Sequence, residues 1–140
     1  MSPVRYIERT TEHFAAQVFP PYQWTVNQTV PWTPFAKRLA DCRVAMISSG
    51  GIYIRDKQPP FNPERDDLTF REIPKDIDVK QLAISHNHYD HSDAEKDINV
   101  VFPIERLREL EQEGFIGSVA PVNYGFMGRI FKRRQLETEM

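Results

Sequence analysis

Two short apolar runs, residues 44–48 and 82–85, constrain the fold of this 140-residue chain more than any other feature of its sequence. Both are compatible with β-structure and mostly apolar rather than alternating, which is typical of strands buried on both faces of a parallel sheet. Residues 117–120 form a third candidate strand, and the alternating residues 68–73 form a shorter one. The pattern predicts an α/β fold with a small, mostly parallel sheet and packed helices, of the Rossmann or flavodoxin-like type.

Helices are expected between and before these strands. The clearest spans residues 104–113, which follow a proline, carry a regular apolar stripe and end at a glycine. A shorter helix is expected at residues 34–41, with Thr33 as its N-cap, and another within residues 7–18. Residues 93–99 are polar and are expected to form a loop.

Three regions of the chain differ in composition. Residues 1–33 form an arm rich in proline and aromatic residues, residues 34–131 hold the expected strands and helices, and residues 132–140 form a polar tail. The basic residues that begin at Arg129 are expected to belong to a solvated chain end. Soluble monomers seldom expose an aromatic patch as large as the one in the arm. We therefore expect the arm to contact a second subunit, which predicts a homo-oligomer.

Charge and cysteine content exclude several classes of protein. The formal net charge is -2, so no strong field favours nucleic acid or an anionic membrane. No stretch is long and apolar enough for a membrane span, and the first residues lack the layout of a signal peptide. The single cysteine, Cys42, cannot form an internal disulfide, and we expect it to be a structural residue beside a strand. The chain is expected to be cytoplasmic.

Three of the four histidines follow the second apolar run directly, as His86, His88 and His91, with Asp90 among them. Imidazole and carboxylate groups at this density supply metal ligands or proton-transfer groups. The segment that leaves a buried strand is also where α/β folds usually place their chemistry. His86, His88 and Asp90 are therefore the catalytic candidates. The alternative is a set of hydrogen-bonded loop residues in which an aspartate caps a turn.

Ser49, Gly50 and Gly51 follow the first apolar run in the same way. Two adjacent glycines after a strand can bring backbone N–H groups close to an anionic ligand, although a bulge or tight turn is the simpler interpretation. Loops at the carboxyl ends of parallel strands converge on one crevice. We therefore expect the histidine cluster to lie near this turn and near Tyr124, in a site for a small amino-acid-like or carboxylated ligand.

By spacing, His86, His88, Asp90 and His91 match the H-x-H-x-D-H signature, so the segment resembles the metallo-β-lactamase-like hydrolases. In that family the first two histidines bind one metal ion, and the aspartate and last histidine bind a second. The resemblance therefore implies a divalent metal, zinc, iron or manganese, and a metal-dependent hydrolase as an alternative function. The further ligands of that family lie downstream, whereas no histidine follows His91 here, and Asp93 replaces the usual glycine.

A longer series of segments resembles a different family. The chain is similar to the selenoprotein B family of glycine, sarcosine, betaine and D-proline reductases, and most similar to its short D-proline-reductase type. The similar segments occur in the same order and with similar spacing, at residues 44–51, 67–74, 84–90, 97–107, 113–120 and 124–128. Agreement across loops and elements together is harder to obtain by chance than one six-residue motif, so we rank this family first.

This resemblance implies the fold of the family, its substrate pocket and an oxidoreductase chemistry on amino-acid-like substrates. In the family, a selenolate or a cysteine thiolate attacks the substrate, and a carbon–nitrogen bond is cleaved reductively. That nucleophile lies downstream of the stretch that matches residues 124–128, where this sequence has no cysteine, and Cys42 precedes the matching region. Because a nucleophile must be present before it can be activated, we expect a second reductase subunit to supply it.

A third interpretation needs no catalysis by any subunit. The aromatic arm and the missing nucleophile are also typical of a non-catalytic module that binds a small ligand or takes part in an assembly.

Overall fold

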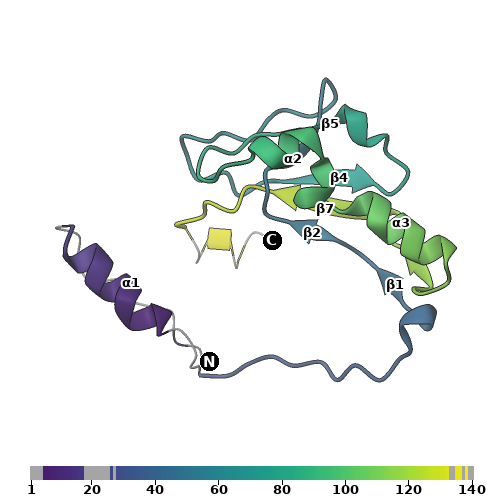
Figure 1. Cartoon of the computed structure of the whole chain (residues 1–140), viewed down its shortest axis with the longest axis horizontal. Coiled ribbons are helices and arrows are strands. Elements are labelled where there is room, and N and C mark those ends of the chain that lie inside the picture. The colour runs from purple at the N-terminus through teal and green to yellow at the C-terminus, as the bar shows by residue number, and fades with distance from the viewer. Residues whose placement is uncertain (1–4, 18–25, 27, 133–134, 137, 139–140) are drawn as a thin grey trace. The chain divides into compact units, whose positions relative to one another are not determined.

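The computed structural model describes residues 5–17, 26, 28–132, 135–136 and 138. It divides the chain into two compact units, residues 1–35 and residues 36–140 (Figure 1). In the first unit the single described helix is α1, Tyr6–Ala15. The helix expected within residues 7–18 is thus present, although none of its residues is buried. The expectation of subunit contact rests on the aromatic residues from Phe14 to Trp32, of which Phe19, Tyr22 and Trp24 lie outside the described residues.

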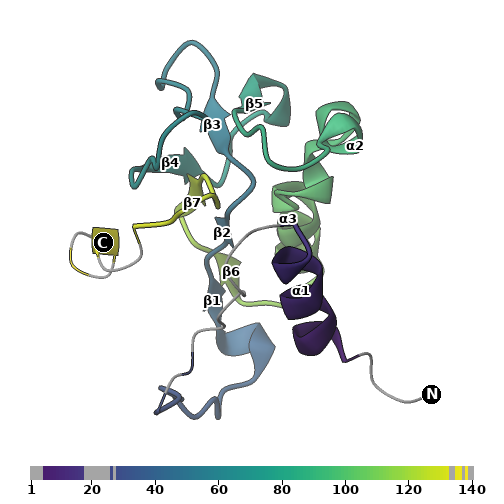
Figure 2. The same ribbon diagram turned by 90° about the vertical axis from the view of Figure 1, so that its left-hand side faces the viewer.

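The second unit combines short strands with helices, which confirms the α/β class. Figure 2 shows α2 and α3 stacked on one side of strands β2 and β6. Its elements are, in chain order, η1 (Leu39–Asp41), β1 (Arg43–Val44), β2 (Ile47–Ser48), β3 (Ile52–Ile54), β4 (Phe70–Pro74), η2 (Val79–Gln81), β5 (Leu82–Ile84), α2 (Ser92–Lys96), η3 (Ile98–Val100), α3 (Ile104–Gln112), β6 (Ser118–Val119) and β7 (Val122–Phe126), where η marks a 3₁₀ helix.

The strand pairing is mixed, whereas the sequence predicted a mostly parallel sheet. β1 pairs with β6 and β2 with β7 in parallel, while β3 with β5 and β4 with β7 are antiparallel. Strand β7 lies between β2 and β4 (Figure 1). The chain changes sheets at Gly51, whose N–H donates to Phe126 O while its carbonyl accepts from Ser85 N. Gly51 has a φ of 75°, so the turn directs β3 away from the parallel pair and toward β5.

The run expected as one strand at residues 44–48 is divided into β1 and β2 by a side chain. Met46 N donates to Asn123 Oδ1 at 2.8 Å, and Asn123 Nδ2 donates to Ala120 O at 3.2 Å. Asn123 is fully buried, and its amide takes the place of backbone groups at the join between β6 and β7. The side chain of Asn123 therefore separates the parallel pair β1–β6 from the parallel pair β2–β7.

The core lies between the strands and α3. Its buried members are Ile52, Ile54, Ile73, Ile77, Leu82, Phe102, Ile104, Ile116 and Val119. The helix expected at residues 104–113 is confirmed as α3, which ends before Gly114 at a φ of 70°. Arg108 joins α3 to the segment after β4 by donating to Lys75 O at 2.5 Å and to Ile77 O at 2.6 Å.

One predicted helix and one predicted loop are wrong. Of the helix expected at residues 34–41, only the single turn of η1 is present, because Phe35 and Leu39 are 65% and 46% exposed and gain little from packing. The loop expected at residues 93–99 instead forms α2 and η3. Ala94, which is 2% exposed, holds α2 against the body, and Asp97 caps η3 by accepting from Asn99 N.

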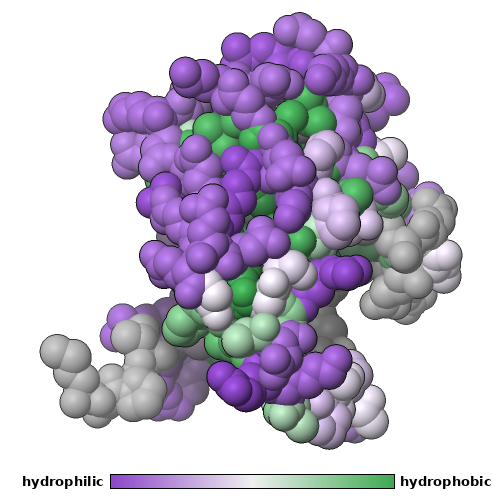
Figure 3. Space-filling model, turned by 90° about the vertical axis from the view of Figure 1, so that its right-hand side faces the viewer, coloured by the Kyte–Doolittle hydropathy of each residue, from purple (hydrophilic) through white to green (hydrophobic). Residues whose placement is uncertain are grey.

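Figure 3 shows one face of the molecule, where hydrophilic residues cover most of the visible surface and apolar residues appear between them in the upper, central and lower parts. Among the described residues, none of the helices has the length and apolar character that crossing a membrane requires.

Candidate functional site

An open cavity of about 690 Å³ lies where three separate segments of the second unit meet. One segment follows β2, one follows β5 and one follows β7, and Val101, just after η3 (Ile98–Val100), completes the lining. The residues that line the cavity are Ser48, Ser49, Gly50, His86, His88, Tyr89, Val101, Gly128, Arg129, Ile130 and Phe131. The cavity therefore contains Ser49, Gly50, His86 and His88, which were the sequence's candidates for ligand binding and catalysis.

Hydrogen bonds fix the turn after β2 to Val101 and to the segment after β5. Ser48 Oγ donates to Val101 O at 2.8 Å and accepts from Gly50 N at 3.2 Å. Tyr89 Oη donates to Gly50 O at 2.9 Å, and this bond joins residues 86–91, the histidine loop, to the turn. Burial, followed by the charge of Glu95, raises the pKa of Tyr89, so its phenol retains the proton that it donates.

Gly51 supports the cavity without lining it. A Cβ atom added there would lie 2.4 Å from Ser85 O and 3.0 Å from His86 Cβ. The glycine is therefore required by the close approach of β5 to the turn. Because the N–H groups of Gly50 and Gly51 both have acceptors inside the protein, neither is free for a ligand.

His86 is held as a neutral imidazole. Its Nδ1 accepts a hydrogen bond from His88 N at 3.1 Å, so the neutral ring carries its proton on Nε2. Burial, followed by the charges of His88 and His91, lowers the pKa of His86 below its ordinary value of 6.5. The unfolded chain therefore binds more protons below about pH 6.5, and the stability contributed by neutral His86 is lost as the pH falls through that region. The ring of His86 also packs edge-on against Tyr89, with centroids 4.7 Å apart.

Asp90 and His91 point to other partners. Asp90 is exposed, and its Oδ1 accepts from Ser92 N at 3.0 Å, so the carboxylate caps the start of α2 rather than holding an imidazole. The hydrogen bonds from the Ser92 backbone and hydroxyl lower the pKa of Asp90. His91 Nδ1 lies 2.9 Å from Glu95 Oε1, within ion-pair distance but without the alignment of a hydrogen bond.

The four residues of the H-x-H-x-D-H signature do not converge on a common point. Among the described residues, which include every histidine of the chain, no three His, Cys, Asp or Glu side chains are arranged to hold a metal ion. The donor set therefore does not fit the zinc, iron or manganese site that the hydrolase resemblance implied, and no chemistry is derived through such an ion.

Tyr124 lies on the outer face of the sheet, and it is not among the residues that line the cavity. It is opposite Ile47 and Glu72 in the strand register, and its ring packs edge-on against Phe70, with centroids 5.7 Å apart. We expected Tyr124 near the turn at residues 49–51 because the sequence did not predict β7 as a strand. In a strand, successive side chains point to opposite faces, and Tyr124 falls on the outward one.

The segment after β7 was missed by the sequence interpretation, which assigned Arg129 to a solvated chain end. Gly128 N donates to Ser49 O at 3.0 Å, and Met127 forms an isolated β-bridge with Gly50. These contacts fold the segment over the turn and place Arg129 in the cavity wall. The available signal was the pair of glycines at 125 and 128, which allow close backbone approach immediately before a basic residue.

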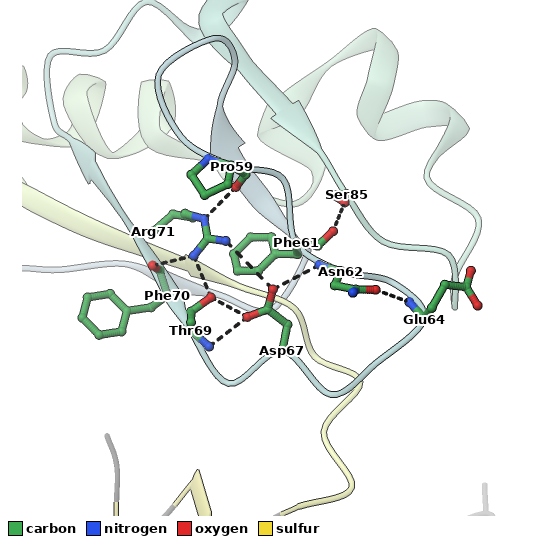
Figure 4. Close-up of polar contacts among 9 residues, drawn as sticks. All are labelled: Pro59, Phe61, Asn62, Glu64, Asp67, Thr69, Phe70, Arg71 and Ser85. Carbon is green, nitrogen blue, oxygen red and sulfur yellow. Dashed lines mark hydrogen bonds and ion pairs between the residues drawn. The ribbon is translucent and has the colours of Figure 1, made fainter.

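A network of polar contacts around Arg71 and Asp67 supports the segment that leads into the histidine loop (Figure 4). Arg71 lies over the ring of Phe61 at 4.2 Å, donates to Pro59 O at 2.9 Å and lies 4.0 Å from Asp67. Burial opposes the ionisation of Asp67, but hydrogen bonds from Thr69 and Asn62 and the charge of Arg71 outweigh it and lower its pKa. Ser85 Oγ donates to Phe61 O at 2.7 Å, so this network fixes the chain one residue before His86.

Comparison with known protein families decides between the two resemblances. The model of the glycine/sarcosine/betaine reductase selenoprotein B family matches residues 10–133. The chain belongs to the selenoprotein B family. D-proline reductase subunit gamma of Acetoanaerobium sticklandii is 46% identical over 98 residues, which cover 69% of this chain. Sarcosine reductase complex component B subunit beta of Peptoclostridium acidaminophilum is 32% identical over 110 residues, which cover 71%.

This member of the selenoprotein B family spans only part of the relatives that it matches. The matched region covers 39% of the D-proline reductase subunit and 23% of the sarcosine reductase subunit. No solved structure matches the chain significantly. The single cysteine, Cys42, is half-buried before β1, where its Sγ donates to Arg38 O at 3.1 Å, and it is not among the residues that line the cavity.

Proposed function

We propose that this chain is the substrate-binding part of a selenoprotein B type reductase and that the cavity holds a small amino-acid-like carboxylate. The observation that supports this most is the convergence of the glycine turn, the histidine loop and the segment after β7 on one cavity. His86 would present its Nε2–H to the ligand, and His88 would act as a second hydrogen-bonding or proton-transfer group. Asp90 would act indirectly, by capping α2 and so fixing the end of the loop.

The class of substrate is proposed from the relatives. Their names specify D-proline reductase, sarcosine reductase and glycine reductase, all of which act on small amino acids. A cavity of about 690 Å³ has room for any of these compounds. Among them we favour D-proline, because the relative at 46% identity is a D-proline reductase subunit.

The nucleophile would come from a partner chain. Reductive cleavage of a carbon–nitrogen bond needs a selenolate or thiolate at the substrate, and the only cysteine of this chain lies outside the cavity lining. The curated relatives are subunits of reductases, and most of their length has no counterpart in this chain. We therefore propose that the chain binds substrate but does not reduce it alone, and that it acts in the cytoplasm.

The outer face of β2, β7 and β4 is the surface that such a partner would cover. By strand register this face carries Ile47, Tyr124, Phe126, Phe70 and Glu72. Ile47 and Phe70 are 69% and 45% exposed, whereas Ser48, Arg71 and Ile73 on the opposite face are buried. In the described part of the chain, this face thus leaves apolar side chains accessible to a partner. The occupant would be a chain that carries the remainder of the family's length, and the homo-oligomer expected from the aromatic arm is the competing arrangement.

Binding of D-proline by the purified chain, measured by calorimetry, tests the proposal. We expect saturable binding that His88→Ala weakens by about 1–3 kcal/mol, because it removes one hydrogen bond to a charged ligand. Asn87→Ala is the matched control, since Asn87 is exposed and does not line the cavity. Thermal unfolding should be nearly unchanged in both variants.

Two results would count against the proposal. One is the absence of binding of D-proline, sarcosine and glycine alike. The other is turnover of any of them by this chain alone, since a nucleophile within it would then have to exist.

A further inference from the structure

Arg129 carries a permanent charge and lies in the cavity wall. Within the described part of the chain, no lysine, aspartate or glutamate lines the cavity beside it. Burial, followed by the charges of His88 and His91, lowers the pKa of His86, and Tyr89 donates its proton to Gly50 O. The cavity therefore offers an anion one fixed positive charge, from a guanidinium that stays protonated at any physiological pH.

The backbone around Arg129 is anchored on both sides. Before it, Gly128 N donates to Ser49 O at 3.0 Å, and a Cβ at Gly128 would lie only 3.0 Å from Ser49 Cβ. After it, Phe131 N and Lys132 N both donate to Asp66 Oδ2, at 3.0 Å and 2.9 Å. These contacts fix the position from which the arginine side chain extends.

The guanidinium of Arg129 lacks a counter-ion in the described structure. The side chain is half-buried, and Cζ lies 4.9 Å from the centroid of the Phe131 ring. Among the described residues, no carboxylate forms an ion pair with it. A planar donor fork that is stacked on an aromatic ring and unpaired matches the geometry of a carboxylate.

The glycine N–H groups beside this cavity are already engaged. The N–H groups of Gly50, Gly51 and Gly128, which the glycine-rich turns could have offered, all donate to acceptors within the protein. An anion that enters the cavity would thus find its strongest partner in Arg129.

We propose that Arg129 forms the carboxylate subsite of the cavity and binds the α-carboxylate of an amino-acid ligand through a bidentate pair of hydrogen bonds. This inference rests on the proposed function, because it concerns the same cavity. It adds the orientation of the ligand: the carboxylate lies toward the segment after β7. The amino group, which only donates hydrogen bonds when protonated, lies toward His88 rather than toward the Nε2–H of His86.

The test compares a carboxylate ligand with its amide in two arginine variants. D-proline and D-prolinamide are titrated into the full chain and into Arg129→Gln, Arg129→Lys and the control Lys132→Gln, whose side chain is exposed outside the cavity lining. We expect Arg129→Gln to weaken D-proline binding about 10- to 100-fold and to leave D-prolinamide binding within about twofold. Arg129→Lys should retain part of the affinity, since it keeps the charge and loses the fork.

The possible failures are distinguishable. If the unchanged chain binds neither ligand, the proposed function fails, and this inference fails with it. If the chain binds D-proline and Arg129→Gln binds it equally well, the inference alone is overturned. An equal loss for D-proline and D-prolinamide in both arginine variants would show that Arg129 maintains the shape of the wall, which also overturns the proposal.

Discussion

At the scale of single residues, Gly51 and Gly114 share a backbone conformation but differ in their surroundings. Their φ values are 75° and 70°, and a Cβ at Gly51 would lie 2.4 Å from Ser85 O, whereas one at Gly114 would meet nothing within 4 Å. We expect Gly114→Ala to lower the free energy of unfolding by about 1–2 kcal/mol, the cost of a left-handed conformation for alanine. Gly51→Ala should cost more, because Ser85 and the histidine loop must also move. Urea denaturation of both variants measures the difference, and equal losses would contradict this account.

The sequence located some residues of the cavity and could not locate others. His86, His88 and Gly50 were found because each follows an apolar run, but parallel strand ends are not what brings them together. Strands β2 and β5 lie in different sheets, and the bonds from Ser85 N to Gly51 O and from Tyr89 Oη to Gly50 O join the two segments. Arg129 enters the cavity through a β-bridge between Met127 and Gly50, and Gly125 and Gly128 indicate a close backbone approach without identifying the distant residue that the segment approaches. Tyr124 was misplaced for a related reason, because the face on which it lies depends on the register of a strand that the sequence did not reveal.

At the scale of elements, Asn123 joins two pairs of strands. Its side chain accepts from Met46 N and donates to Ala120 O, and it is completely buried. Asn123→Ala would leave both backbone groups without a partner, and we expect a loss of about 1–3 kcal/mol in the free energy of unfolding. The exposed Asn87→Ala should change it by less than about 0.5 kcal/mol. An Asn123→Ala variant as stable as Asn87→Ala would refute the role assigned to this side chain.

Elements with a complete local pattern were predictable, and those that depend on tertiary contacts were not. Helix α3 has an apolar stripe, a proline before it and a glycine after it, so the sequence predicted its position. Helix α2 is only five residues long, and its stability depends on the burial of Ala94, which a polar sequence does not reveal. The helix expected at residues 34–41 does not form beyond one turn. Its apolar residues, unlike Ala94, are exposed and gain no stability from packing.

At the scale of the whole molecule, the exposed outer face of β2, β7 and β4 is where a partner chain should bind. A suitable probe is a fragment of the Acetoanaerobium sticklandii relative that covers the part of its length unmatched here. Ile47→Ser and Phe70→Ser should each weaken its binding at least tenfold in analytical ultracentrifugation, because each removes apolar area from the centre of the interface. Val100→Ser is the control, as an equally exposed apolar residue outside this face. Undiminished binding by both variants would refute the interface, and dimerisation of the chain through this face would identify a second copy as the occupant.

The central claim is that the three segments around the cavity form one ligand site, and a titration of ¹⁵N-labelled protein with D-proline tests it most directly. We predict saturable shifts in the amide resonances of residues 48–50, 86–89 and 128–131, with one dissociation constant for all three groups. Shifts confined to the second cavity, lined by Arg55, Leu82 and Lys96, or no saturable shift in any segment, would contradict it.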